Sequence, residues 1–261
     1  TTAHYNTAVG SSAMEGCTTG EYNTAVGSLC MDAALTGNFN TAIGRAALGA
    51  NTTGSSNCAV GINALGANTT GGNNHAMGDS AADVITTGNN NVAIGSSALG
   101  AATTSSSNTA IGHIALTLNT TGANNVAVGQ NAGGANTTAT ANTLIGDSAG
   151  YGVTTGGSNT FVGKAAGCVG TTGNNNIMLG FLAKQSAVGI NDEIVIGTNT
   201  IAKGAATGFI DAYGGGNYAG NNSASWSTTS DRRIKKNIVD NNIGLDKISQ
   251  IQVRNFEYRT L

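Results

Sequence analysis

Apolar and polar residues alternate along this chain in a repeating unit that recurs twelve times. In its commonest form the unit carries an asparagine, a short stretch T-A-V or T-A-I, a glycine and a second apolar pair, A-L. A turn that often reads N-T-T-G, as in residues 51–54, completes the unit. Alternation over a few residues is typical of a β-strand, so each unit predicts a short strand, a second short extended piece and two turns.

One asparagine and one glycine set the register of the repeat. The glycines recur at a constant interval, equal to the distance in sequence between Gly10 and Gly27, and no insertion breaks the series. Each asparagine stands four positions before its glycine, except in the last unit, where Glu193 takes the place of the asparagine. The repeat positions to which we assign a structural role are Asn6, Gly10, Asn23, Gly27, Asn40, Gly44, Asn57, Gly61, Asn91, Gly95, Asn108, Gly112, Asn125, Gly129, Asn142, Gly146, Asn159, Gly163, Asn176 and Gly180. Glycine allows a positive φ or a close approach of two backbones. Stacked asparagines can form a ladder of hydrogen bonds that also satisfies turn groups; a row that binds sugar or metal is the alternative.

A period without drift predicts that every coil lies on the previous one in register. Stacked strands are about 4.8 Å apart, so twelve coils would form a rod of roughly 60 Å. We therefore expect an all-β fold, a β-solenoid shaft of twelve coils over residues 1–200. A glycine-rich neck or linker is expected over residues 201–229, and a separate module over residues 230–261.

The strand pattern also predicts a contact surface. Threonine and the residue before the glycine, such as Thr7 and Val9, point to one face, and the residue between them points to the other. That second face is alanine in eight consecutive units: Ala8, Ala25, Ala42, Ala59, Ala76, Ala93, Ala110 and Ala127. A face exposed to solvent would tolerate larger side chains, so uniform alanine predicts a partner packed closely against this face. Oligomerisation follows as a hypothesis.

Side-chain volume moves between two repeat positions in the later units. The alanine position becomes Leu144, Phe161, Met178 and Val195. The position four after the glycine, which is Met or Leu in most earlier units, becomes Gly133, Gly150 and Gly167. Close packing would produce this exchange if both positions fill one space, so we predict that they touch.

Composition excludes several classes of protein. Only 9% of residues are charged and 40 of 261 are glycine, unlike an ordinary globular domain. Proline, which cannot donate to a β-ladder, is absent. A net charge of −2 argues against nucleic-acid binding, and no run of about 20 apolar residues predicts membrane insertion.

Metal and cofactor chemistry is not predicted. Cys17, Cys30, Cys58 and Cys168 follow no metal-ligand spacing and are interpreted as small buried fillers. His4, His75 and His113 fall at different positions of the unit, without a carboxylate or cysteine at ligand spacing. No aspartate row typical of calcium-binding β-rolls and no phosphate-binding loop is present. We expect no metal and no cofactor.

The N-T-A-V/I-G-x-x-A-L unit resembles two groups of repeats over residues 5 to about 200. One is the head of trimeric autotransporter adhesins, with a similar S-V-A-I-G signature, and the other is the N-T-A-I-G repeat of tail-fibre proteins. The resemblance implies a left-handed parallel β-roll, a homotrimer, and attachment to surfaces.

The C-terminal module opens with Ser230 and reads S-D-R-R-I-K-K-N-I. It resembles the start of the intramolecular chaperone domain called peptidase S74, which trimerises tail spikes and fibres and then cuts itself off. The resemblance implies Ser230 and Lys235 as the autocleavage pair and a cut between Thr229 and Ser230. A lysine with a depressed pKa could take the hydroxyl proton, so that Ser230 attacks the preceding carbonyl. A short helical tail over residues 243–251 that caps the rod is the alternative.

We therefore expect a structural subunit of a trimeric viral (phage) tail fibre or surface fibre involved in host attachment, located on the virion or another extracellular surface. Its expected partners are two further copies of the chain, a host cell-surface receptor such as a glycan, and other fibre or baseplate proteins. A bacterial trimeric adhesin head is one alternative. Ice binding through threonine pairs such as Thr52-Thr53 is a remote one. No enzyme activity on external substrates is expected, because no acid–base pair is visible.

Overall fold

The structure, a computed structural model, describes residues 2–169, 172–211, 217–219 and 227–228. The chain divides into two units, Thr1–Thr228 and Thr229–Leu261, and all described residues belong to the first. Those residues contain strands and turns but no helix. The strands are β1 (Thr7–Val9), β2 (Thr24–Val26), β3 (Thr41–Ile43), β4 (Cys58–Val60), β5 (His75–Met77), β6 (Val92–Ile94), β7 (Thr109–Ile111), β8 (Val126–Val128), β9 (Thr143–Ile145), β10 (Thr160–Val162), β11 (Ile177–Leu179), β12 (Ile194–Gly197), β13 (Gly208–Asp211), β14 (Asn217–Ala219) and β15 (Ser227–Thr228).

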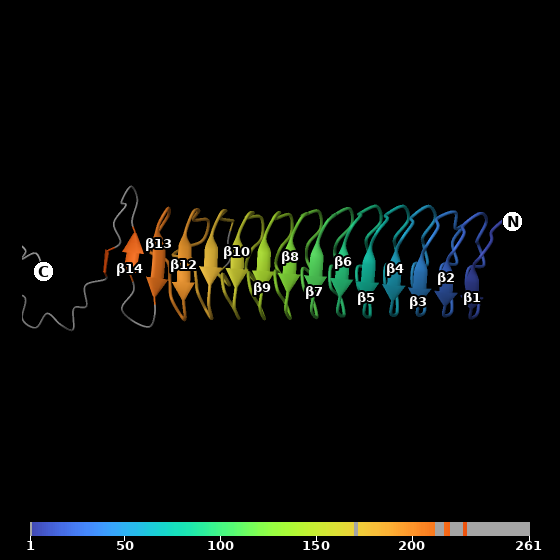
Figure 1. Ribbon diagram of the computed structural model, residues 1–261, viewed down its shortest axis with the longest axis horizontal. Coiled ribbons are helices and arrows are strands. Elements are labelled where there is room, and N and C mark those ends of the chain that lie inside the picture. Colours follow the sequence, from blue (N-terminus) through green and yellow to red (C-terminus); the bar gives the residue numbers. More distant parts are fainter. Residues whose placement is uncertain (1, 170–171, 212–216, 220–226, 229–261) are drawn as a thin grey trace, which may run out of the picture. The chain divides into compact units, whose positions relative to one another are not determined.

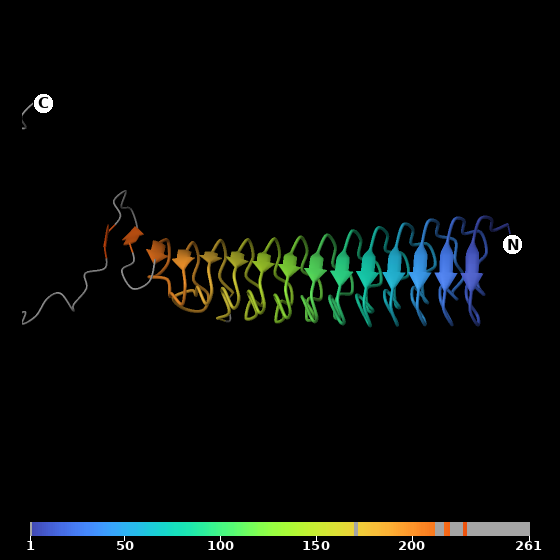
Figure 2. The ribbon, with the colours of Figure 1, turned by 60° about the horizontal axis from the view of Figure 1, so that its bottom comes forward.

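The strands form one sheet in sequence order, with one strand contributed by each coil. From β1 to β12 each strand pairs in parallel with the next, and every residue lies beside its counterpart in the next unit, as Thr24 lies beside Thr41. Figures 1 and 2 show these strands stacked in one column with the turns on the other sides. The expected all-β solenoid of about twelve turns is therefore confirmed. Strand β13 continues the parallel pairing, and β14 and β15 add antiparallel pairs.

The second extended piece expected in each unit is a turn instead. Its residues two and four positions after the glycine are left-handed, as in Ala46 (φ 55°) and Leu48 (φ 50°). Alternating left-handed residues bend the backbone and prevent an extended run. Hydrogen bonds between coils continue around this turn; for example, Leu48 N donates to Ala64 O in the next coil at 3.0 Å.

The register glycines stand where two backbones meet. From Gly10 to Gly180 their φ lies between +127° and +145°. A Cβ added to Gly44 would lie 2.7 Å from the carbonyl carbon of Gly61 in the next coil. Both reasons for glycine that the sequence suggested, a positive φ and a close approach, therefore apply at this position.

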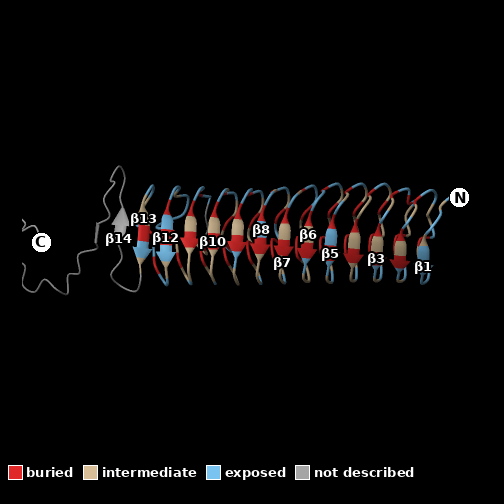
Figure 3. Ribbon diagram, viewed as in Figure 1, coloured by how far each residue is buried: buried red, intermediate tan, exposed pale blue. Residues whose placement is uncertain are grey.

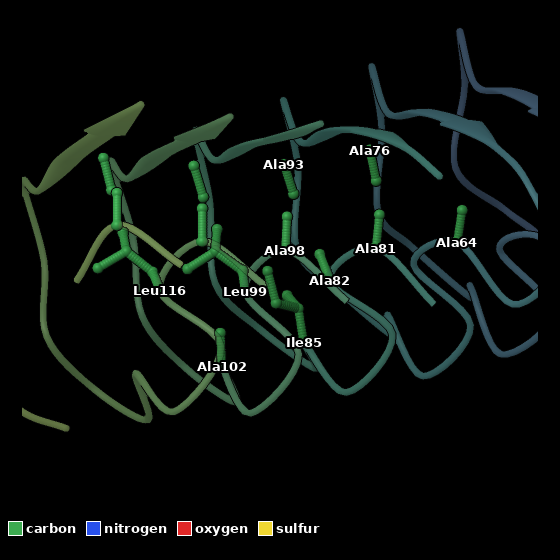
Figure 4. Packing of buried hydrophobic residues seen from close by; sticks show 14 of the residues in the cluster. Ala64, Ala76, Ala81, Ala82, Ile85, Ala93, Ala98, Leu99, Ala102 and Leu116 are labelled. Atoms are coloured by element: carbon green, nitrogen blue, oxygen red, sulfur yellow. The ribbon is translucent and has the colours of Figure 1, made fainter. Parts of the chain in front are cut away.

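The alanine face lies inside the coil, and the prediction that a separate partner covers it is wrong. The alanines from Ala25 to Ala127 are at most 3% exposed within a single chain. Ala76 faces Ala81, and Ala93 faces Ala98, across the interior of their own coils (Figure 4). In most of these coils a buried leucine or methionine four positions after the glycine fills the rest of the narrow interior, so that only a methyl group fits beside it on the strand. This explains the uniform alanine without a second molecule.

The predicted contact between the two exchanging positions is confirmed, within one chain. A Cβ on Gly150 would lie 2.5 Å from Leu144 Cδ2, and one on Gly133 would lie 2.8 Å from Leu144 Cδ1. The larger residues of the later strands thus occupy the space that leucine fills in earlier coils. The packing density of the core is kept, while the larger side chain moves from the turn position four after the glycine to the middle of the strand.

Candidate functional site

A continuous ladder of asparagines runs along the interior beside the strands. In each step the backbone N–H of one asparagine donates to Oδ1 of the asparagine one coil earlier, from Asn23 onto Asn6 through to Asn176 onto Asn159. Asn108 also donates from Nδ2 to the turn carbonyl of Gly122 at 2.9 Å. Nearly all of these amides are buried, and they bond to one another and to turn backbone, so their role here is to hold the coils together.

Glu193 closes this ladder at the unit where the asparagine is missing. Its backbone N–H donates to Asn176 Oδ1 at 3.0 Å, as an asparagine would. Its buried carboxylate then accepts hydrogen bonds from the backbone N–H and the hydroxyl of Ser186. The hydrogen-bond donors of Ser186 replace the asparagine contacts that the next coil would provide.

The outward face of the sheet carries two columns of side chains, one on each side of the buried residue. Figure 3 shows the buried residue of most strands between more exposed neighbours. The column next to the glycine is apolar in every coil: Val9, Val26, Ile43, Val60, Met77, Ile94, Ile111, Val128, Ile145, Val162, Leu179 and Ile196. Several of these side chains are well exposed, including Val9 (57%) and Ile94 (38%). We call these two columns together the outward strip.

No lysine, arginine, aspartate or glutamate belongs to the outward strip over β1 to β12. Its second column consists of Thr7, Thr24, Thr41, Cys58, His75, Val92, Thr109, Val126, Thr143, Thr160, Ile177 and Ile194. Charged residues occur instead at the corner after the glycine, where Lys164 and Asp147 form an ion pair at 3.0 Å. The outward strip, with its partly exposed aliphatic column and no Lys, Arg, Asp or Glu, is therefore a candidate interaction surface.

In the threonine pairs of the turns, the first threonine hydrogen-bonds to the next coil and the second is exposed. Thr52 Oγ1 donates to Thr69 O in the next coil at 3.0 Å, and Thr69 repeats this toward Thr86. The second residue of each pair, such as Thr53, is exposed. Only one threonine column therefore faces outward at this side, as expected for adjacent residues.

Three aromatic rings stack on the first three coils, a feature that we did not anticipate from the sequence. The rings of Tyr5 and Tyr22 have centroids 4.8 Å apart, and those of Tyr22 and Phe39 have centroids 5.3 Å apart. All three rings are exposed and nearly parallel. Their recurrence at one position of three successive units was the available signal.

The remaining candidate residues are distributed as follows. Ser230, Lys235 and the alternative helix over residues 243–251 lie outside the described residues. Cys30 is a buried filler as expected, whereas Cys58 is half-buried on the outward strip, which corrects its assignment to the interior. Within the described part of the chain, no group of three or more His, Cys, Asp or Glu residues could hold a metal ion, and no helix could cross a membrane.

Comparison with known proteins adds no further constraint to this site. We found no protein-family model, no curated protein and no solved structure that matches the chain.

Proposed function

We propose that the chain is a structural subunit of a trimeric fibre, such as a phage tail fibre, whose solenoid forms the shaft and whose assembly serves attachment to a host surface. The observation that carries this proposal is the outward strip. It runs along all twelve coils without a formal charge and leaves aliphatic side chains in solvent in the single chain. Burying that strip against further copies of the chain would remove this exposure.

The strip is just large enough for a specific self-association. Twelve strands at about 4.8 Å and a width of about 10 Å give a footprint of roughly 500–600 Å² per chain. Exposed apolar patches of this size commonly mark interaction sites on monomers. Two such footprints come to roughly 1,000–1,200 Å² in total, near the lower end of specific protein interfaces.

Copies of the same chain are the occupants that fit the strip best. Because every coil repeats the same columns, two parallel chains would present identical side chains at each level along their whole length. The number three and a left-handed winding are taken from the resemblance to adhesin heads and tail-fibre repeats. The motif that begins at Ser230 favours a fibre over an adhesin head, because it resembles a trimerising chaperone.

The same motif supports a single self-cleavage as part of the proposal. Lys235 would take the hydroxyl proton of Ser230, and Ser230 Oγ would attack the carbonyl carbon of Thr229. The C–N bond between Thr229 and Ser230 would break as its nitrogen takes up that proton, which leaves an ester. Water would then hydrolyse the ester to give a carboxylate on Thr229 and a new amino terminus at Ser230. Such a cut would make assembly irreversible, because the shaft would remain after its folding aid has left.

The experiment combines electron microscopy of the purified chain with light scattering. We expect straight particles whose mass is three times that of one chain, which is 25.7 kDa if uncut and less if residues 230–261 have been cut off. The repeat region should be roughly 60 Å long. Compact particles with the mass of one chain would contradict the proposal.

A further inference from the structure

The outward strip changes its chemistry at one place, where β4 and β5 lie side by side. Cys58 on β4 and His75 on β5 are partners in the sheet register, and Met77 follows His75 on the same face. At the equivalent positions, the other coils carry threonine, valine, isoleucine or leucine. A thiol, an imidazole and a thioether thus replace ordinary strand residues together rather than at scattered positions.

The sheet geometry brings these three side chains over one patch. Adjacent strands are about 4.8 Å apart, and residues two apart on a strand are about 6.6 Å apart. Side chains on one face stand roughly perpendicular to the sheet, so their ends project in the same direction. Cys58 is half-buried, whereas His75 and Met77 are exposed, Met77 by 52%. Among the described residues, none of the three side chains has a hydrogen-bond or ion-pair partner.

We propose that Cys58, His75 and Met77 form a binding site for a soft monovalent metal ion of the Cu(I) class. Thiolate and thioether sulfur are ligands that select Cu(I), and imidazole binds copper as well. Zinc fits less well, because its protein sites use cysteine, histidine and carboxylate ligands. Around the cluster the strip offers Thr41, Val60, Val92 and Ile94, which include no carboxylate.

Binding is a ligand exchange that leaves the oxidation state unchanged. The Cys58 thiol loses its proton to solvent, its sulfur forms a bond to Cu(I), and His75 and Met77 donate neutral nitrogen and sulfur lone pairs. All three ligands come from one chain, so the site does not rest on the proposed fibre. In an assembly that packs by the outward strip, the site of each chain would lie at the contact between copies.

The repeat supplies the control substitutions. Threonine occupies the positions of Cys58 and His75 in neighbouring coils, as at Thr41, and isoleucine occupies that of Met77, as at Ile94. A chain with Cys58→Thr, His75→Thr and Met77→Ile therefore keeps residues that the fold already accepts. Circular dichroism of the variant checks that the strands are retained.

The experiment titrates the reduced full chain with Cu(I) under anaerobic conditions against a chromophoric Cu(I) chelator. We expect the wild type to hold one Cu(I) per chain more than the triple variant, and X-ray absorption of that ion to show two sulfur neighbours and one nitrogen. His75→Thr alone and Met77→Ile alone should each weaken competition by at least about tenfold, as losses around metal sites commonly do. A Cys17→Ser control should leave this ion bound.

Two results would overturn the proposal. In the first, the wild type and the triple variant take up the same amount of Cu(I). In the second, binding depends on Cys58 alone and is unchanged by His75→Thr and Met77→Ile, which would describe a single reactive thiol. Neither result bears on chain number, so failure of this site and failure of the trimer are distinguishable.

Discussion

A Cβ atom on Gly167 would lie 2.5 Å from Cγ of Phe161, so the phenyl ring occupies the space that a side chain at position 167 would need. In an earlier coil the same two positions hold Ala93 and Leu99, both buried. In one arrangement the large side chain comes from the strand, and in the other it comes from the turn, but both fill the same part of the coil interior. This relationship makes the core of each coil testable by paired substitution.

Gly167→Ala should destabilise the solenoid by about 1–3 kcal/mol, because it adds a methyl group to a filled core. Phe161→Ala alone should cost about 3–5 kcal/mol by leaving a cavity. The double variant Phe161→Ala with Gly167→Leu, which restores the pairing of Ala93 and Leu99, should lose less than the sum of Phe161→Ala and Gly167→Leu measured singly. Chemical denaturation measures all four, and strict additivity would argue against a shared space.

Asn108→Ala should lower the free energy of unfolding by more than the loss of so small a side chain would suggest. The substitution removes the donor to Gly122 O and the Oδ1 that accepts from Asn125 N at 3.0 Å. Each buried group left without a partner costs about 1–3 kcal/mol. The exposed Gln130→Ala, one coil away, should change stability by less than about 0.5 kcal/mol. Equal thermal unfolding midpoints for the two variants would show that the ladder contributes nothing.

Cys30 should resist alkylation in the native protein at pH 8. Burial raises the pKa of the Cys30 thiol to about 11, and the thiol donates a hydrogen bond to Ala42 O at 3.3 Å. The reactive thiolate is therefore scarce, and access is blocked. Cys17, Cys58 and Cys168, which are half-buried, should react before Cys30, and all four cysteines should react after denaturation. Mass spectrometry of labelled peptides reports the order; rapid native labelling of Cys30 would place it outside the core.

The raised pKa of the Cys30 thiol also predicts how the free energy of unfolding should change with pH. Below the ordinary thiol value near 9 the thiol is neutral in both folded and unfolded chains, and its contribution to stability is fully present. Between about 9 and 11 only the unfolded chain ionises, so the free energy of unfolding should fall as pH rises. Cys30→Ala should reduce this part of the pH dependence, which denaturant titrations at a series of pH values would measure.

Self-cleavage should depend on two residues of the C-terminal module. The wild-type chain should yield a fragment that begins at Ser230, and Ser230→Ala should abolish it because the nucleophile is lost. Lys235→Ala should do the same by removing the base, whereas Lys236→Ala is the matched control and should still cut. Amino-terminal sequencing identifies the fragment. A wild-type chain that stays whole, or loss of the fragment with all three variants, would refute the assignment.

Much of the fold could be predicted because one period governs it. The spacing of Gly10 and Gly27 gave the coil, the strand and the register, and the exchange between Leu144 and Gly150 gave an interior contact. The sequence alone did not tell which strand face is internal, because alternation separates two faces without assigning either one to the core. The pattern therefore allows Ala93 at an interface or in the interior, and only the folded coil shows that Ala93 lies inside and Ile94 outside.

The cluster at Cys58 was missed for a related reason. Ligand spacing was sought along the chain, whereas Cys58 and His75 belong to successive units and become neighbours only when coils stack in register. The period already contained that information, since residues at the same position of successive units are adjacent in the sheet. Comparing columns across coils, rather than motifs within a coil, would have found it.

The central claim is that the outward strip is the surface by which copies of the chain associate, and mass in solution tests it most directly. Wild-type protein, Ile94→Asp and Leu118→Asp should be compared by sedimentation at equal concentration. Leu118 is a matched control, because it is more exposed (52% against 38%) but lies in a turn outside the strands. We predict trimers for the wild type and Leu118→Asp, and dissociation toward single chains for Ile94→Asp, since a carboxylate would be buried without a partner. A monomeric wild type, or an Ile94→Asp variant that keeps the full trimer mass, would contradict the account.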